Sequence, residues 1–300
     1  MRETFLPYGR PSIGDTEIAA AMTCFQNGWL TTGARVREFE EVFAKRAGVK
    51  YAVAVNSCTA ALHLGLIALG LGPGDEVIMP SLTFVAGAQC TREIGATPVF
   101  ADIDPETLCM TAATIEAVLT PRTRAIIPMH YGGRPSGIAD ILALASSRGI
   151  RVLEDAAHAA GMLEDGRWSG TLSDGAAYSF YPTKNITTGE GGMFVTNDRA
   201  MMERVRVLSL HGMNKDAWKR YTAGGSWRYD VVEPGYKYNL TDVAAAMGVV
   251  QLERLEELQA RRDAIARAYL KALDGIPGVT PASQMLTAPD RHSWCMFVVL

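Results

Sequence analysis

Lys184 is the residue of this sequence whose surroundings most favour chemistry. It lies in the run Tyr-Ser-Phe-Tyr-Pro-Thr-Lys-Asn-Ile-Thr-Thr-Gly-Glu-Gly-Gly (178–192). Aromatic, apolar and glycine neighbours solvate a cation poorly, and a desolvated lysine loses its proton more readily. A neutral lysine amine can form a Schiff base with an aldehyde. The alternative interpretation is a solvated loop lysine, which is what most such lysines are.

Two short strands are expected to hold this lysine in place. Residues 177–181 alternate between the two sides of a strand, and Pro182 ends it. Gly192–Thr196 forms the second strand, after a glycine-rich turn. That turn, Gly189-Glu-Gly-Gly, is not a nucleotide-binding loop, because it lacks the GxGxxG spacing and the position between a strand and a helix. We therefore expect Lys184 on a loop anchored by two buried strands.

Residues 56–59, Asn-Ser-Cys-Thr, are a candidate anion site. They connect a predicted strand, Tyr51–Val55, to a predicted helix over residues 60–69. The free backbone N–H groups and the dipole at the start of that helix favour a phosphate, and the Ser57 and Thr59 hydroxyls add donors. The alternative is that one of these two side chains only caps the helix.

Strands and helices continue to alternate along the chain. Strands are predicted over residues 76–79, 97–101, 125–129 and 151–153, with helices over residues 83–95, 113–119 and 137–147. This alternation predicts an α/β fold with a mostly parallel central sheet and helices on both faces. Ligands of such sheets bind beyond the carboxyl ends of the strands. That rule selects Ser57, Thr59, Ser81, Phe84, Asp102, His130, Glu154, Asp155 and His158.

Asp155 is the acidic residue with the clearest candidate role. Small residues follow it, so it faces a closely packed environment. It could cap a helix, or it could pair with a ring nitrogen and hold that nitrogen protonated by charge attraction. His158 lies three residues further on and shares a face with Asp155 if the segment is helical. The alternative for His158 is a structural or solvated histidine.

The composition argues against several classes of function. The formal net charge is −3 and no basic run occurs, which argues against binding of nucleic acid or of an anionic membrane. The five cysteines form no CxxC pair, which argues against a zinc site and for a reducing compartment. We find neither the roughly 18 consecutive apolar residues of a membrane-spanning helix nor a signal peptide. A soluble, cytoplasmic protein is expected.

The two ends of the chain predict further elements. Residues 12–28 form an expected helix with Ile18, Met22 and Phe25 on one face. A long helical segment over residues 241–275 would span roughly 50 Å if unbroken, so we expect it to bend or to bridge two domains. Residues 293–300 begin another predicted strand. We predict a large domain over residues 1–240, followed over residues 241–300 by the bridging helix and the start of a small domain.

Three features have to coincide at a site for pyridoxal 5′-phosphate (PLP). A helix N-terminus holds the phosphate, an acid faces the ring nitrogen, and a lysine reaches the aldehyde. Residues 57–59, Asp155 and Lys184 offer these groups on one inferred edge of the sheet. Each of these three features alone is weak support for such a site, but all three occur together by chance much more rarely than any one of them does. The sequence therefore predicts a PLP site.

Four runs of the sequence resemble the DegT/DnrJ/EryC1/StrS family. They are Gly-Asp-Glu-Val-Ile-Met-Pro-Ser-Leu-Thr-Phe (74–84), Glu-Asp-Ala-Ala-His-Ala (154–159), Thr-Lys-Asn-Ile-Thr-Thr-Gly-Glu-Gly-Gly (183–192) and Gly-Tyr-Lys-Tyr-Asn-Leu-Thr-Asp (235–242). The resemblance covers nearly the whole chain. It implies a fold-type I, PLP-dependent aminotransferase of sugar nucleotides, with a small C-terminal domain of which this chain holds only the start.

A closer likeness lies in residues 130–135, 211–213 and 216–218. These segments are most similar to the bacterial enzymes that aminate UDP-4-keto sugars, notably the UDP-4-amino-4-deoxy-L-arabinose type. The resemblance thus implies a UDP-4-keto sugar as the acceptor.

The resemblance also implies a role for each candidate residue around the cofactor ring. Lys184 would bind the cofactor aldehyde and move a proton to and from the substrate carbon. Asp155 would hold the pyridinium, Phe84 would stack on the ring, and His158 would lie near the ring and its 3-hydroxyl.

The implied phosphate site draws on two protomers. Ser179 would join Cys58 and Thr59 on the phosphate, and Asn239 would reach the phosphate of the neighbouring protomer. The resemblance therefore implies a homodimer with shared active sites.

The implied reaction is transfer of an amino group from glutamate to a nucleotide-linked ketosugar by a ping-pong mechanism. Two alternatives stay open. One is a related PLP-dependent sugar dehydratase, against which Lys184 argues because those enzymes carry histidine at its position. The other is a non-catalytic protein that keeps the fold, since family members continue beyond the last strand expected here.

Overall fold

The computed structural model describes residues 4–214 and 229–300. The described helices are α1 Asp15–Gln26, α2 Ala34–Ala47, α3 Cys58–Ala68, α4 Ala86–Glu93, α5 Ala112–Glu116, α6 Ile138–Arg148, α7 Arg199–Leu208, α8 Asp242–Glu253 and α9 Leu255–Leu273, with a 3-10 turn η1 at Tyr131–Gly133. The described strands are β1 Tyr51–Val55, β2 Glu76–Pro80, β3 Thr97–Ala101, β4 Thr123–Ile126, β5 Arg151–Asp155, β6 Gly175–Ser179 and β7 Gly192–Thr196.

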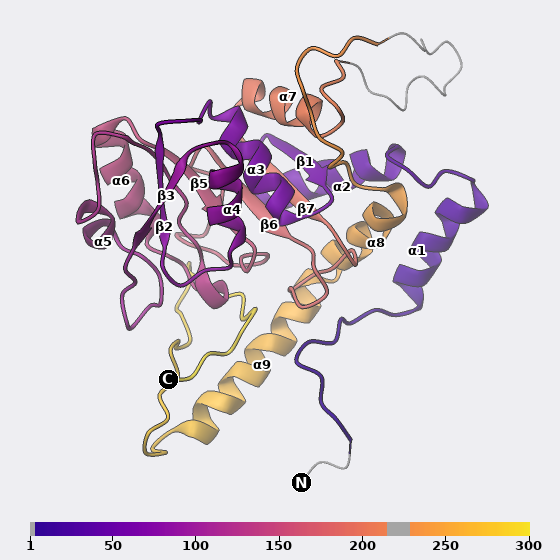
Figure 1. Ribbon diagram of the computed structural model, residues 1–300. Helices are drawn as coiled ribbons and strands as arrows, with labels where there is room; N and C mark the ends of the chain where they lie inside the picture. The colour runs from indigo at the N-terminus through magenta and orange to yellow at the C-terminus, as the bar shows by residue number, and fades with distance from the viewer. Residues whose placement is uncertain (1–3, 215–228) are drawn as a thin grey trace.

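The described strands form one sheet in the order β1-β7-β6-β5-β4-β2-β3 (Figure 1). β2 to β6 run parallel to one another, while β7 is antiparallel to both β1 and β6. β1 therefore points the same way as the parallel strands, and all their carboxyl ends meet at one edge. The expected α/β fold with a mostly parallel sheet is confirmed.

Helices cover both faces of this sheet. On one face α2 and α8 pack on alternate residues of the strands, with Tyr178 of β6 against Phe43 of α2 at a ring-centroid distance of 5.1 Å. On the other face α3 and α7 enclose Ala177 and Phe194. Successive residues of β6 thus enter opposite cores, as the pleat of a strand requires. β6 is therefore buried on both sides, but it ends at Ser179, and Tyr181 at the end of the predicted run is exposed.

The helical segment after Thr241 is not one unbroken helix. Thr241 caps α8 through its hydroxyl, which accepts a hydrogen bond from the Ala244 N–H at 3.3 Å. α8 is interrupted at Arg254, and the chain continues as α9, which extends away from the sheet (Figure 1). In the described residues no helix is long and apolar enough to cross a bilayer.

The strand predicted over residues 293–300 does not form as a whole. Residues 293–296 bond to a loop, and only the end of the segment pairs as a strand would, through an isolated antiparallel bridge between Val299 and Pro281. Ser293 N and Met296 N donate to Gly133 O and Gly132 O at 2.9 and 3.1 Å, while Leu300 N donates to Thr280 O at 2.8 Å. The apolar pattern correctly indicated that this segment packs against the rest of the protein. It did not indicate which residues form hydrogen bonds with its backbone.

The apolar face expected on the first helix lies on the outside of the chain. Ile18, Met22 and Phe25 are about half exposed in α1. The residues that α1 buries are Glu17 and Cys24, against α8 and the loop before it. A helical period therefore located the apolar stripe correctly, although the stripe does not face the core of its own chain.

Glu17 connects α1 to the junction between α8 and α9. Its carboxylate accepts hydrogen bonds from Gly14 N at 2.9 Å, Gln251 Nε2 at 2.7 Å and Arg254 Nη1 at 2.5 Å. Burial alone would raise the pKa of Glu17, but these donors outweigh it and lower the pKa to about 2. Because the folded pKa is depressed, the stabilisation is present above pH 4.5 and is lost as the pH falls toward 2.

We expect Glu17→Gln to lower the free energy of unfolding at pH 7 by about 3 kcal/mol. Urea unfolding from pH 7 to pH 3 measures the difference from the parent chain, and that difference should shrink as the pH falls. Glu41→Gln on α2, an exposed carboxylate, is the matched control. A difference that does not change with pH would contradict this account of Glu17.

Candidate active site

The carboxyl edge of the sheet places the predicted site residues in neighbouring positions. Val55 of β1 pairs with Gly192 of β7, which pairs with Ser179 of β6. Asp155, the last residue of β5, pairs with Ala177 two residues earlier in β6. One row of the sheet therefore brings together the start of α3, the end of β6 and the end of β5.

The N-terminus of α3 lies directly on β7. A Cβ atom on Gly192 would lie 2.4 Å from Ser57 C and 2.6 Å from Cys58 N, so only glycine allows this approach. The Ser57 hydroxyl accepts a hydrogen bond from Ala60 N at 3.0 Å and caps the helix. The Thr59 side chain is exposed. The capping alternative is confirmed for Ser57, while the free N–H groups of the first turn still suit a phosphate.

Cys58 links this helix start to the strand beside Asp155. Its Sγ donates to Ala177 O at 3.4 Å. Burial, reinforced by the nearby Asp155 charge, raises the pKa of Cys58 well above its ordinary value, although Lys184 opposes the shift. The thiol therefore stays protonated at neutral pH and keeps its hydrogen bond to Ala177 O.

Asp155 is a buried carboxylate with unused hydrogen-bonding capacity. Its side chain accepts from Ala157 N at 3.0 Å, and no other side-chain hydrogen bond is found for it among the described residues. Burial raises the pKa of Asp155, whereas the Lys184 charge lowers it. A buried acid with a free oxygen suits a charged ring N–H, which would stabilise its ionised form. On this observation the residues present fit a pyridinium.

His158 lies in a turn, so the condition for sharing a helical face with Asp155 is not met. Ala159 N and Met162 N donate to carbonyls three residues back, and no helix follows β5 directly. Burial, and then the charge of Lys184, lowers the pKa of His158 to about 3. Its Nδ1 accepts from Gly132 N at 3.3 Å. The imidazole is therefore neutral at pH 7, with its proton on Nε2.

Lys184 lines a cleft of about 860 Å³ together with His158. Its backbone N–H donates to Tyr181 O at 2.9 Å, which closes the turn after β6. Its charge acts on the pKa values of Asp155, His158 and Cys58, so the lysine and these three groups are close in space. The predicted amine, acid and helix N-terminus thus surround one region.

The remaining predicted residues have different surroundings. The Ser179 hydroxyl is buried at the end of β6 and accepts from Tyr181 N at 3.4 Å. Phe84 precedes α4 and is 70% exposed. Asn239 lies beside Val55 through its backbone, and its side chain donates to Thr32 Oγ1 at 2.6 Å. The segment 216–218, used for the closer likeness, lies outside the described residues.

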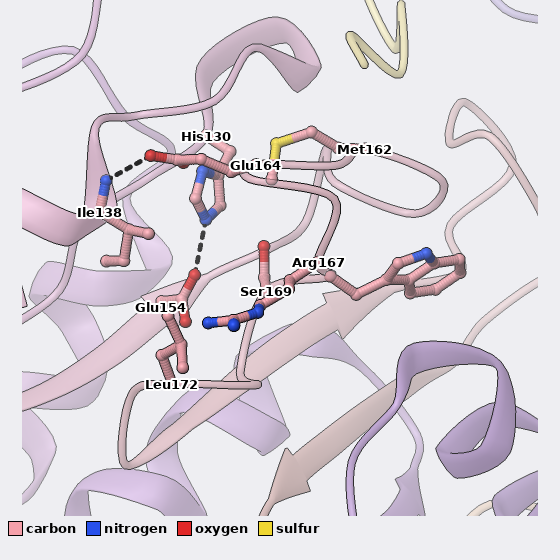
Figure 2. Close-up of a pocket in the computed structure, with 9 residues that line it drawn as sticks. His130, Ile138, Glu154, Met162, Glu164, Arg167, Ser169 and Leu172 are labelled. Atoms are coloured by element: carbon pink, nitrogen blue, oxygen red, sulfur yellow. Dashed lines mark hydrogen bonds and ion pairs between the residues drawn. The ribbon is translucent and has the colours of Figure 1, made fainter. Parts of the chain in front are cut away.

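A buried histidine and a buried glutamate support the strand that carries Asp155 (Figure 2). His130 Nε2 lies 2.8 Å from Glu154 Oε2, and both side chains are almost fully buried. Glu154 Oε1 also accepts from Gly170 N at 2.7 Å and from Ser173 Oγ at 2.5 Å. The strand-end rule selected His130 and Glu154 without indicating that they pair. The Glu154 side chain points to the opposite face from Asp155, because neighbouring residues of a strand face opposite sides.

We expect Glu154→Leu to lower the free energy of unfolding by about 4 kcal/mol, because it leaves the His130 ring nitrogen and the Gly170 N–H without their acceptor. Urea unfolding at pH 7 measures the change. Glu106→Leu, at an exposed position, is the control. A loss smaller than about 1 kcal/mol would show that this cluster contributes little to stability.

Arg262 is a residue near Lys184 that sequence reasoning missed. Its guanidinium donates to Trp294 O at 2.8 Å and, more weakly, to Lys184 O at 3.5 Å. Asn185 Nδ2 donates to Ser293 O at 2.6 Å. The same C-terminal segment therefore also contacts the loop of residues 180–191 that carries Lys184, the lysine loop. These partners are backbone carbonyls far away in sequence, and no local pattern marks such contacts.

Comparison with known proteins gives consistent matches along the chain. A sequence model of the DegT/DnrJ/EryC1/StrS aminotransferase family matches residues 11–300. The spore coat polysaccharide biosynthesis protein SpsC of Bacillus subtilis (strain 168) is 50% identical over 299 residues, which cover 99% of this chain and 76% of SpsC.

Solved structures agree with this assignment. The aminotransferase TlmJ of Streptoalloteichus hindustanus superimposes with a TM-score of 0.91 and 38% identity, over 98% of this chain and 78% of TlmJ. Spr1654 of Streptococcus pneumoniae in its PLP form has a TM-score of 0.89 and 32% identity, over 98% of this chain and 77% of that one. The chain belongs to the DegT/DnrJ/EryC1/StrS aminotransferase family and is a PLP-dependent aminotransferase.

Proposed function

We propose that this enzyme transfers an amino group from glutamate to the keto carbon of a nucleotide-linked ketosugar, in two alternating half-reactions. The observation that carries the proposal is that Lys184 and His158 line one cleft, while the Lys184 charge also acts on Asp155 at the end of β5 and on Cys58 at the start of α3. The family and the polysaccharide role in the name of SpsC support a sugar as the acceptor.

PLP would supply an aldehyde carbon that takes up the amino group and a ring that accepts electrons from the substrate carbon. The Asp155 carboxylate would hold the proton on the ring nitrogen. Lys184 Nζ would hold the aldehyde and, as the amine released by the donor, would move a proton at the substrate carbon. His158, neutral at pH 7, offers its Nε2–H to an oxygen near the ring.

The phosphate and the ring faces involve the remaining predicted residues. The first-turn N–H groups of α3, with Ser57, Cys58 and Thr59, form the phosphate site, to which Ser179 adds its hydroxyl. We assign Phe84 to cover the ring, and its 70% exposed side chain leaves an apolar surface available for that contact.

A homodimer forms part of the proposal, with Asn239 reaching the phosphate of the neighbouring protomer. The exposed apolar stripe of α1, Ile18, Met22 and Phe25, supports it, since such stripes are usually covered by a partner. We expect light scattering of the PLP-bound protein to give twice the mass of the chain. A monomer that binds PLP tightly would contradict the shared site.

The acceptor we propose is a UDP-4-keto sugar, on the likeness of residues 130–135 and 211–213 to enzymes of the aminoarabinose type. We place the reaction in the cytoplasm, in keeping with the five free cysteines of the chain. A panel of UDP-, GDP- and dTDP-linked ketosugars with glutamate tests the proposal by formation of 2-oxoglutarate. Turnover should be fastest with a UDP-linked sugar. Absence of turnover with every ketosugar, in protein that carries PLP, would contradict it.

A further inference from the structure

The cleft at Lys184 is much larger than a site for the reacting atoms requires. Its volume of about 860 Å³ lies near the upper end for small-molecule sites. Three parts of the chain form its walls: residues 8–12, α9, and the segment 295–297. The space beyond Lys184 can therefore accept the distant part of a substrate.

Residues 8–12 are held against the lysine loop. The Tyr8 hydroxyl donates to Met296 Sδ at 3.3 Å, and a Cβ on Gly9 would lie 2.9 Å from Thr183 Cγ2. Ser12 O accepts from Gln251 Nε2 at 2.9 Å. Arg10 lies between these fixed points, exposed on the wall of the cleft. Among the described residues it has no hydrogen bond or ion pair.

Arg261 lines the same cleft from α9. The next residue, Arg262, donates to Trp294 O and to Lys184 O, and so fixes this turn of the helix beside the lysine. Arg261 itself is exposed and has no hydrogen bond or ion pair among the described residues. Arg10 and Arg261 are thus two uncommitted guanidinium groups, each adjacent to a residue in contact with the lysine loop.

The charges around the cleft favour an anion. Three arginines and Lys184 line it, and the carboxylate among its described lining residues, Glu257, lies 3.4 Å from Arg254. A cleft lined mainly by one sign of charge attracts ligands of the opposite sign. Guanidinium groups bind carboxylates and phosphates through paired hydrogen bonds.

We infer that Arg10 and Arg261 form a substrate-anion site, which binds the negatively charged group of a substrate away from its reacting carbon. The inference rests on the proposed function. Both proposed substrates carry such a group: the side-chain carboxylate of glutamate and the diphosphate of the sugar nucleotide. The shared chemistry is that of an oxyanion held by two guanidinium groups.

Calorimetric titration of the PLP-bound protein tests the inference with glutarate and with UDP, which carry the two anions and cannot be transaminated. Arg10→Gln and Arg261→Gln should each weaken at least one probe by about tenfold or more. Loss confined to glutarate identifies the donor carboxylate, and loss confined to UDP identifies the diphosphate. Because neither probe reacts, the result does not depend on turnover with any ketosugar.

Arg267→Gln is the matched control, because Arg267 is an exposed arginine of α9 that does not line the cleft. It should bind both probes as the parent protein does. Melting temperature and cofactor absorbance should be the same in all three variants. If the Arg10 and Arg261 variants bind both probes with affinities within twofold of the parent, the substrate-anion site is overturned. It is also overturned if the parent protein binds neither glutarate nor UDP.

Discussion

Replacement of Lys184 by alanine should abolish transamination while the protein remains folded and still binds PLP non-covalently. Lys184 lines the cleft with His158, its charge acts on the buried Asp155, and no other lysine lines the cleft among the described residues. Loss of the group that moves the proton at the substrate carbon alone costs roughly 10²- to 10⁴-fold in rate. Loss of the covalent link to the cofactor adds to this.

The measurement is the single-turnover rate of the PLP-bound protein with glutamate, followed by the change in cofactor absorbance. Lys271→Ala, at an exposed position near the end of α9, should leave that rate unchanged. A Lys184→Ala protein that reacts within tenfold of the parent rate would remove Lys184 from the proposed chemistry.

The second large effect is expected for Asp155→Asn. The amide has the shape of the carboxylate, so the hydrogen bond from Ala157 N can persist and PLP should stay bound. An uncharged partner no longer holds the proton on the ring nitrogen, because that proton depends on attraction to a nearby negative charge. We expect the single-turnover rate with glutamate to fall by roughly 10²-fold or more.

Asp140→Asn in the exposed first turn of α6 is the control for the Asp155 variant. The pH dependence of cofactor absorbance provides a second measurement, since a structural role for Asp155 would not change the ionisation of the ring. A rate and an absorbance profile equal to those of the parent would contradict the role of Asp155.

Most of the sheet could be predicted from the sequence, because its signals are local. Short apolar runs bounded by Gly, Pro and Asp locate the strands, and the alternation with helices indicates that they run parallel. The carboxyl-end rule then selects Ser57, Asp155 and His158 without any knowledge of contacts. Their meeting at one edge follows from the strand order, which the structure supplies.

What the sequence could not indicate depends on contacts between distant residues. The pairing of His130 with Glu154 and the contact of Arg262 with the lysine loop join segments far apart in the chain. The outward position of the apolar stripe of α1 could not be predicted for a related reason, because a helical period does not show which surface covers an apolar face. The segment 293–300 has a strand-like pattern, but its hydrogen-bond partners are loops.

The central claim is that the Lys184 amine is the group that captures PLP. Reduction of the PLP-bound protein with borohydride fixes the cofactor to the amine that holds it, and peptide mass analysis then locates the label. The account predicts one label for each chain, on the peptide that contains Lys184. A label on any other lysine, or a protein that takes up PLP without a reducible bond, would contradict it.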